Sequence, residues 1–115
     1  MEIRIKDKKL KAALEDKATC KRRYGMEMAQ KLMTRMGALT AAKALVDFWP
    51  PMRGPERCHE LTGNLAGQFS MDLKHPYRLL LVPTDVQDKA DFHDEKERWA
   101  AIRSVEILGI EDTHG

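Results

Sequence analysis

The middle of the chain alternates between hydrophobic and polar residues, and this pattern predicts three short strands joined by two turns. The strands are expected at 57–61, 68–73 and 77–82. In the second strand, Phe69, Met71 and Leu73 alternate with polar residues, as they do in a strand with one buried face. The glycines of 62–67 and the proline of 74–76 predict the two turns. Together these segments form an antiparallel meander.

Two helices are predicted before this meander, because hydrophobic residues recur there at spacings of three and four. The first follows Asp7, a suitable N-cap, and ends at Gly25 after a basic run. The second spans about 26–42, where Met28, Leu32, Met36 and Leu39 form one apolar face.

Two further strands flank these elements. A short one at 2–6 alternates isoleucine with charge and is expected at a sheet edge, whereas the last, which contains Val105 and Ile107, is apolar enough to be central. Residues 84–98 are highly charged and predict a surface loop, with one helical turn near 94–98. The order predicts an α+β fold: two N-terminal helices on one face of a mainly antiparallel, curved sheet of about five strands, with the other face open.

Length and charge narrow the class of protein. A chain of 115 residues predicts one domain, 1–115, and a net charge of +2 means that an anion-binding surface must come from local clustering. Two cysteines, Cys20 and Cys58, are expected as free thiols. No signal-peptide or membrane-spanning apolar run is evident, so we expect a cytoplasmic protein with no membrane contact.

Polar residues predict a cluster on the open face. If the last strand pairs beside 77–82, Asp112 and His114 come near Arg78, and His59 lies on the neighbouring strand. Metal-independent RNA cleavage needs such residue types: a base for the 2′-OH, an acid for the leaving oxygen and a cation for the phosphorane. The pattern alone also fits a structural histidine and a polar C-terminal tail.

A metal site is the competing chemical interpretation. Cys58 and His59 are adjacent, which is not a zinc-ligand spacing, and no second pair follows at finger distance. We therefore expect neither a metal nor a cofactor.

Several motifs, in this order, resemble HigB-type toxins of the RelE/ParE toxin–antitoxin superfamily. The segments are Tyr-Gly at 24–25, Arg-Cys-His-Glu-Leu-Thr-Gly at 57–63, Gly-Gln-Phe-Ser-Met-Asp-Leu at 67–73, Pro-Tyr-Arg-Leu-Leu at 76–80 and Ile-Glu-Asp-Thr-His at 110–114. The resemblance covers nearly the whole chain except the charged loop after Pro83. It implies a cytosolic bacterial toxin that cleaves mRNA in the ribosomal A site. It also implies a HigA-type antitoxin partner with a helix-turn-helix domain, so that operator DNA is contacted only through the antitoxin.

The resemblance assigns site residues by position. The catalytic set is His59, Arg78, Asp112 and His114. We expect further RNA contacts from Arg57, Thr62, Ser70 and Thr113. Active family members often carry lysine at the position of Thr62 and tyrosine at that of Thr113, so a cation and a base-stacking ring are missing here. Arg57 could replace part of the lost charge.

Two functions remain open from the sequence. The first is a ribosome-dependent mRNA endoribonuclease that inhibits translation and requires no metal. The second is a non-catalytic protein of the same fold, which would inhibit a target by occupancy, as ParE-type relatives do, or only bind its antitoxin. His59, Arg78, Asp112 and His114 favour the enzyme, whereas Thr62 and Thr113 favour the binding protein.

Overall fold

The computed structural model describes residues 1–86 and 89–112, and five strands among them form one sheet in the order β1-β5-β4-β3-β2. The strands are β1 (Glu2–Ile5), β2 (His59–Glu60), β3 (Phe69–Asp72), β4 (Tyr77–Pro83) and β5 (Ser104–Asp112). Strand β1 pairs with β5 in parallel, and all other pairs are antiparallel. The predicted meander, the central last strand and the edge position of β1 are confirmed, and the fold is α+β.

The N-terminal helices differ from the prediction in number. Helices α1 (Lys8–Glu15), α2 (Lys17–Tyr24) and α3 (Met26–Ala41) precede the meander, and α4 (Glu95–Ala101) precedes β5. The single helix expected after Asp7 is broken at Asp16, which has extended backbone angles and accepts a hydrogen bond from the Thr19 amide through its side chain. An aspartate that caps the next helix competes with helix continuation, and this explains the break.

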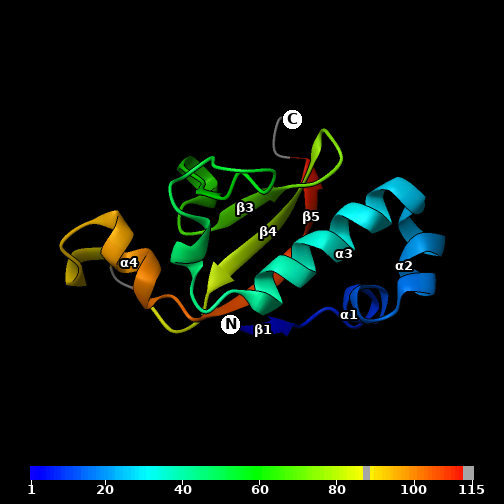
Figure 1. The fold of residues 1–115 in the computed structure, drawn as a ribbon, viewed down its shortest axis with the longest axis horizontal. Coiled ribbons are helices and arrows are strands. Elements are labelled where there is room, and N and C mark those ends of the chain that lie inside the picture. The colour runs from blue at the N-terminus through cyan, green and yellow to red at the C-terminus, as the bar shows by residue number, and fades with distance from the viewer. Residues whose placement is uncertain (87–88, 113–115) are drawn as a thin grey trace.

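Helix α3 lies along one face of the sheet, and the other helices occupy the two ends of the molecule (Figure 1). Helices α1 and α2 lie at the right of the view, α2 at the end of α3 and α1 below it, and α4 lies at the opposite end of the molecule. Three 3₁₀ turns, η1 (Leu45–Phe48), η2 (Gly63–Leu65) and η3 (Lys89–Asp91), complete the connections.

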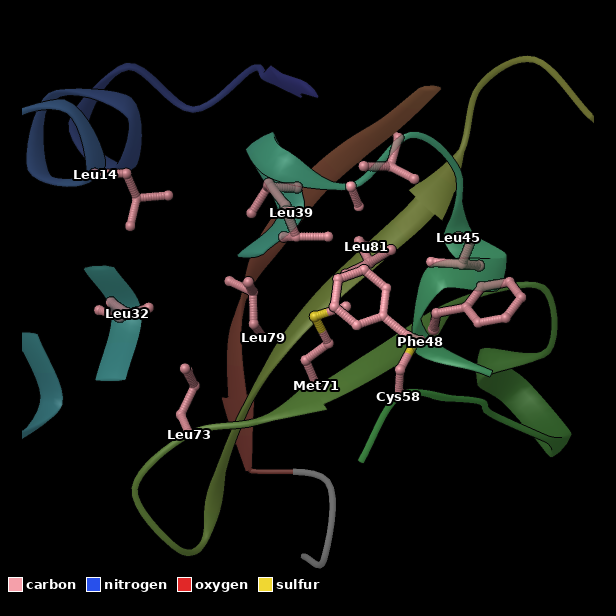
Figure 2. Packing of buried hydrophobic residues seen from close by; sticks show 14 of the residues in the cluster. Leu14, Leu32, Leu39, Leu45, Phe48, Cys58, Met71, Leu73, Leu79 and Leu81 are labelled. Carbon is pink, nitrogen blue, oxygen red and sulfur yellow. The ribbon is translucent and has the colours of Figure 1, made fainter. Parts of the chain in front are cut away.

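The hydrophobic core lies between α3 and the sheet, as predicted. Phe69, Met71, Leu32 and Leu39 are all fully buried, and Leu73 is nearly so. Figure 2 shows Met71, Leu79 and Leu81 of the strands packed together with Leu39 of α3. One face of the meander is therefore buried in the core, and only its other face can carry a surface site.

Strand β5 contains a β-bulge that changes which of its residues face the core. Leu81 is opposite Ile107, but Leu80 is opposite Gly109, so Leu108 is an extra residue without a partner on β4. A bulge shifts the alternation of all later residues by one. Val105 and Ile107 face the core before the bulge, and Ile110 packs against it afterwards.

No helix within residues 1–86 and 89–112 has the length and apolar character needed to cross a membrane.

Candidate functional site

Two rows of residues cross the sheet on the face away from α3. Directly opposite residues of neighbouring strands point to the same face, with Cβ atoms about 5 Å apart. The first row is His59, Ser70, Leu80 and Gly109, and the second is Asp72, Arg78 and Glu111. The rows are two residues apart along the strands, or about 7 Å. His59 and Arg78 thus share a face, as predicted, but lie two strands apart.

Asp72 joins two arginines in this site. Its carboxylate lies 3.2 Å from Nε of Arg78 and 3.5 Å from Nε of Arg57, one oxygen to each. The Arg78 side chain is 17% exposed and that of Arg57 is 50% exposed, so Arg57 extends into solvent from the pair. Two guanidinium groups held on one carboxylate make a cationic surface with defined geometry, which suits a phosphate group.

His59 is fixed by the backbone of the residue two positions before it. Its Nδ1 lies 2.8 Å from the carbonyl oxygen of Arg57. A carbonyl oxygen only accepts, so Nδ1 carries the proton and a neutral ring keeps its lone pair on Nε2. Arg57 adopts φ 46°, in the left-handed region that is uncommon for a residue other than glycine. Arg57 therefore connects His59 with the Asp72–Arg78 pair.

Glu60, next to His59, points to the other side and joins β2 to α4. Its Oε1 lies 2.9 Å from Nη1 of Arg98 and 3.0 Å from Nζ of Lys89. Burial raises the pKa of Glu60, but the hydrogen bonds from Lys89 and Arg98 outweigh burial, so that the pKa is below its usual value. This ionic cluster stabilises the short strand that carries His59.

The C-terminal part of the predicted site is shifted by the bulge. Asp112 lies opposite Tyr77, on the side of the helices, and Glu111 is the residue opposite Arg78. Without the bulge, the alternation that begins at Val105 would place Asp112 on the open face, which was the sequence expectation. The predictions for Thr113 and His114 fall outside the described residues.

The predicted RNA contacts differ in their access to solvent. Arg57 and Thr62 are exposed, as an RNA-binding role requires. Ser70 is wrong as an RNA contact in this structure, because it is 0% exposed. Its alternation with Phe69 and Met71 was read correctly, but alternation does not show which parts of the other sheet face are covered.

A hollow lies beside Arg78 on the same face. Its volume is about 310 Å³, and it is lined by Leu65, Gln68, Leu80, Leu108, Gly109, Glu111 and Asp112. Leu80 is a buried apolar residue of its lining, and Glu111 is the acidic lining residue that shares the face of Arg78. The site therefore combines a cationic pair, a histidine and a pocket within two rows of the sheet.

Sequence reasoning missed two residues of this site, Asp72 and Glu111. Asp72 shares the parity of Gln68 and Ser70, so the polar side of β3 was the available signal. For Glu111 the signal was the change of phase from Val105 and Ile107 to Ile110, which indicates an inserted residue.

No protein-family model matches the chain, and a comparison with curated proteins finds no match. Solved structures are similar over nearly the whole length. The YoeB/ParE toxin from Agrobacterium tumefaciens has a TM-score of 0.56 and 12% identity, and the match covers 97% of this chain and 98% of that one. The chain has a YoeB/ParE toxin fold. In the YoeB–YefM complex from Staphylococcus aureus, the matched chain gives a TM-score of 0.52 and 14% identity over 96% of this chain and 94% of that one.

The YoeB dimer from Staphylococcus aureus gives the same result, with a TM-score of 0.52, 15% identity and coverage of 95% and 92%. The TM-scores of 0.52–0.56 show a shared fold, and at identities of 12–15% they show the fold alone, so the activity must be argued from the site. Within residues 1–86 and 89–112, no three His, Cys, Asp or Glu side chains are grouped so that they could hold a metal ion.

Proposed function

We propose that this protein is the toxin of a toxin–antitoxin pair and cleaves mRNA on the ribosome without a metal ion. The observation that carries the proposal is the pair of arginines on Asp72, placed beside a histidine whose Nδ1 is fixed by the Arg57 carbonyl. This arrangement lies on the open sheet face of a YoeB/ParE toxin fold. The HigB-type assignment and the cytoplasmic location belong to the same proposal.

The chemistry follows from the positions of the charges. His59, through Nε2, removes the proton of the 2′-OH, and the resulting oxygen attacks the adjacent phosphorus. Arg78 and Arg57 stabilise the negative charge that develops on the phosphorane oxygens. The 5′-oxygen leaves with a proton, for which His114 is the proposed donor.

We also propose a HigA-type antitoxin as the neutralising partner, with the ribosome and its mRNA as the target. Helix α2 presents Lys21, Arg22 and Arg23 in its last turn, all exposed. Beside this turn, a groove of about 490 Å³ lies between α2 and α3. Its apolar lining includes Met26 and Met33 of α3, and Lys17 and Lys21 of α2 also line it. An acidic amphipathic segment of the antitoxin matches both the charge and the groove.

The test is mRNA cleavage on programmed ribosomes, with cut sites mapped by primer extension. Arg78→Ala is expected to lower the rate constant by about 10²–10³-fold, as for the loss of one preorganised donor. His59→Ala is expected to lower it by about 10²–10⁴-fold. Arg4→Ala and His93→Ala are matched controls, because Arg4 and His93 are exposed residues outside the site.

Undiminished cleavage by folded Arg78→Ala and His59→Ala proteins would remove this site from the mechanism. If the parent protein arrests growth but cuts no mRNA, the function shifts to inhibition by occupancy. That outcome would agree with the departures at Thr62 and Thr113.

A further inference from the structure

Strand β1 lies at the end of the sheet and has one edge open. Among the described residues its neighbouring strand is β5 alone, and Figure 1 shows β1 along the lower margin of the molecule. The Glu2 amide donates to the Arg103 carbonyl at 3.0 Å, on the β5 side. Because backbone groups alternate in direction along a strand, the N–H and C=O groups of Ile3 and Ile5 point away from the sheet. They are placed to pair with one further strand.

An apolar groove lies beside this edge on the helix side of the sheet. Its volume is about 570 Å³, and its lining includes Ile3, Ile5, Leu14, Met33, Met36 and Gly37. Ile3 and Ile5 are half-buried. At Gly37 an added Cβ would meet no atom within 4 Å, so the groove is open there. An added strand can therefore combine backbone pairing with apolar contacts in this groove.

The sequence of β1 is complementary to itself. Residues 1–5 are in turn apolar, acidic, apolar, basic and apolar. Two such strands can pair antiparallel about Ile3. Glu2 of each copy then lies opposite Arg4 of the other. The apolar residues also meet, with Ile3 opposite Ile3 and Met1 opposite Ile5. Both faces of the strand thus match their copy, and opposite charges in directly opposing positions stabilise the pair.

The direction of the backbone groups restricts the register. Since Ile3 and Ile5 point their groups outward, other symmetric registers differ from this one by shifts of two residues. Centring the pair on Arg4 would place two arginines opposite each other, and centring it on Glu2 would do the same with two glutamates. Centring it on Ile5 would place Arg4 opposite Lys6. The register about Ile3 is therefore the symmetric one that pairs each charge with its opposite.

We propose that the β1 edge binds a second copy of this chain in this register, so that one sheet continues through both copies. A charge such as Arg4 opposes pairing with an unrelated strand, whereas the copy's Glu2 complements it. Directly opposite residues of an antiparallel pair point to the same face, so the two-fold axis is perpendicular to the sheet. Both open faces, each with its arginine pair, then lie on the same side of the dimer. The proposal does not depend on the proposed function.

The test is the dissociation constant of the dimer, measured by sedimentation equilibrium on the purified chain. Arg4→Glu and Glu2→Arg each place like charges opposite one another in both charged pairs, so each should raise the constant by about 10-fold or more. The double variant Glu2→Arg/Arg4→Glu restores opposite charges and should return the constant to within about 2-fold of the parent value. Lys96→Glu, a matched charge reversal on α4, should leave it unchanged.

The two single variants are expected to remain folded. Within one chain the Glu2 and Arg4 side chains are 3.8 Å apart and each 67% exposed, and such exposed ion pairs contribute little to stability. An equimolar mixture of the two variants gives a sharper measurement. One chain then carries two basic residues and the other two acidic residues at positions 2 and 4, so every charged pair in the mixed dimer joins opposite charges. The mixture should associate about as tightly as the parent, although neither variant does so alone.

A parent chain that stays monomeric at millimolar concentration would overturn the proposal, and so would a dissociation constant that is the same in the parent and both single variants. A mixture that fails to associate would exclude this register and the proposal with it. Hydrogen exchange gives a second measurement, because the Ile3 amide should be protected in the dimer and exposed in the monomer. Protection of this amide only after the product of an adjacent small gene is added would assign the edge to a different protein and refute binding of a second copy.

Discussion

Asp72 organises the site at the scale of single residues. Its carboxylate holds Arg57 and Arg78, while its backbone is fixed from two other elements. The Asp72 amide donates to the Glu56 carbonyl at 2.7 Å, and its own carbonyl accepts from Nε of the buried Arg35 at 2.6 Å. Because Arg35 belongs to α3, the position of the carboxylate is set by the core as well as by the strand.

Replacing Asp72 by Asn keeps the size of the side chain but removes the charge between the two arginines. The guanidinium groups then repel each other and lose their fixed spacing, so we expect cleavage on programmed ribosomes to slow by about 10- to 100-fold. Asp91→Asn, an exposed change in η3, serves as the control. Faster cleavage by Asp72→Asn would show instead that this carboxylate weakens phosphate binding.

Cys58 gives a prediction for alkaline pH. Burial, with a smaller contribution from the charge of Glu56, raises the pKa of this thiol to about 12. The unfolded thiol ionises near its usual value of 9, so between these values the unfolded chain releases a proton that the folded one retains. Stability is therefore lost as pH rises, by about 1.4 kcal/mol at pH 10.

Urea unfolding from pH 8 to 10, compared with Cys58→Ala, measures this contribution. The difference in unfolding free energy between the two proteins should change across this range. A constant difference would mean that the thiol is accessible to water in the folded state.

At the scale of elements, α4 is attached to the strand that carries His59 through one buried arginine. The Arg98 side chain is 6% exposed, bonds to Glu60 and lies 5.5 Å from the centre of the Phe69 ring. Trp99 packs edge-on against both Phe69 and Trp49, at 5.4 and 5.1 Å. The position of the two-residue strand β2 is thus stabilised by a helix that begins more than thirty residues later in the chain.

Arg98→Met removes one partner of this pair and should lower the unfolding free energy by about 3 kcal/mol, because Glu60 remains largely buried and keeps only Lys89. The double variant Arg98→Met/Glu60→Leu should be less unstable than the sum of the single variants by about 1–3 kcal/mol. Denaturant unfolding gives both values, with Arg103→Met at an exposed position as the control. Additive effects would contradict a coupled pair.

Local patterns predicted most elements but not their interruptions. The alternation of Phe69, Met71 and Leu73 gave the buried face of β3, since period 2 depends only on the chain itself. The break at Asp16 was missed because apolar spacing continues through it, and side-chain capping competes with that spacing. Alternation from Val105 did not predict the shift of Asp112, because the bulge is set by pairing with β4.

The whole molecule has a strongly uneven distribution of charge. Residues 8–24 contain seven basic and two acidic residues, a net of +5, although the entire chain carries only +2. Figure 1 places α1 and α2, which make up most of this segment, at one end and α4 at the other. A basic charge concentrated at one end of a molecule orients that end toward an acidic partner, or toward the phosphate-rich ribosome, before contact.

Reversing two of these charges, with Lys21→Glu and Arg22→Glu together, should weaken antitoxin binding by about 10-fold or more at low salt and by less at high salt. The partner is to be produced from the adjacent small gene and its affinity measured by calorimetry at two ionic strengths. Lys96→Glu on α4 should leave binding unchanged. If no neighbouring gene product binds the parent protein, the antitoxin part of the proposal is wrong.

The position of β5 has a consequence for how the protein is made. This strand is the last of the five in chain order, yet it lies between β1 and β4 and supplies Gly109 and Glu111 to the two rows of the site. During synthesis, β1 has no neighbour and β4 has one open edge until residues 104–112 have emerged. Pairing between such distant segments also forms slowly. Until residues 104–112 have emerged, the nascent chain therefore carries an unassembled site, because Gly109 and Glu111 have not yet joined its two rows.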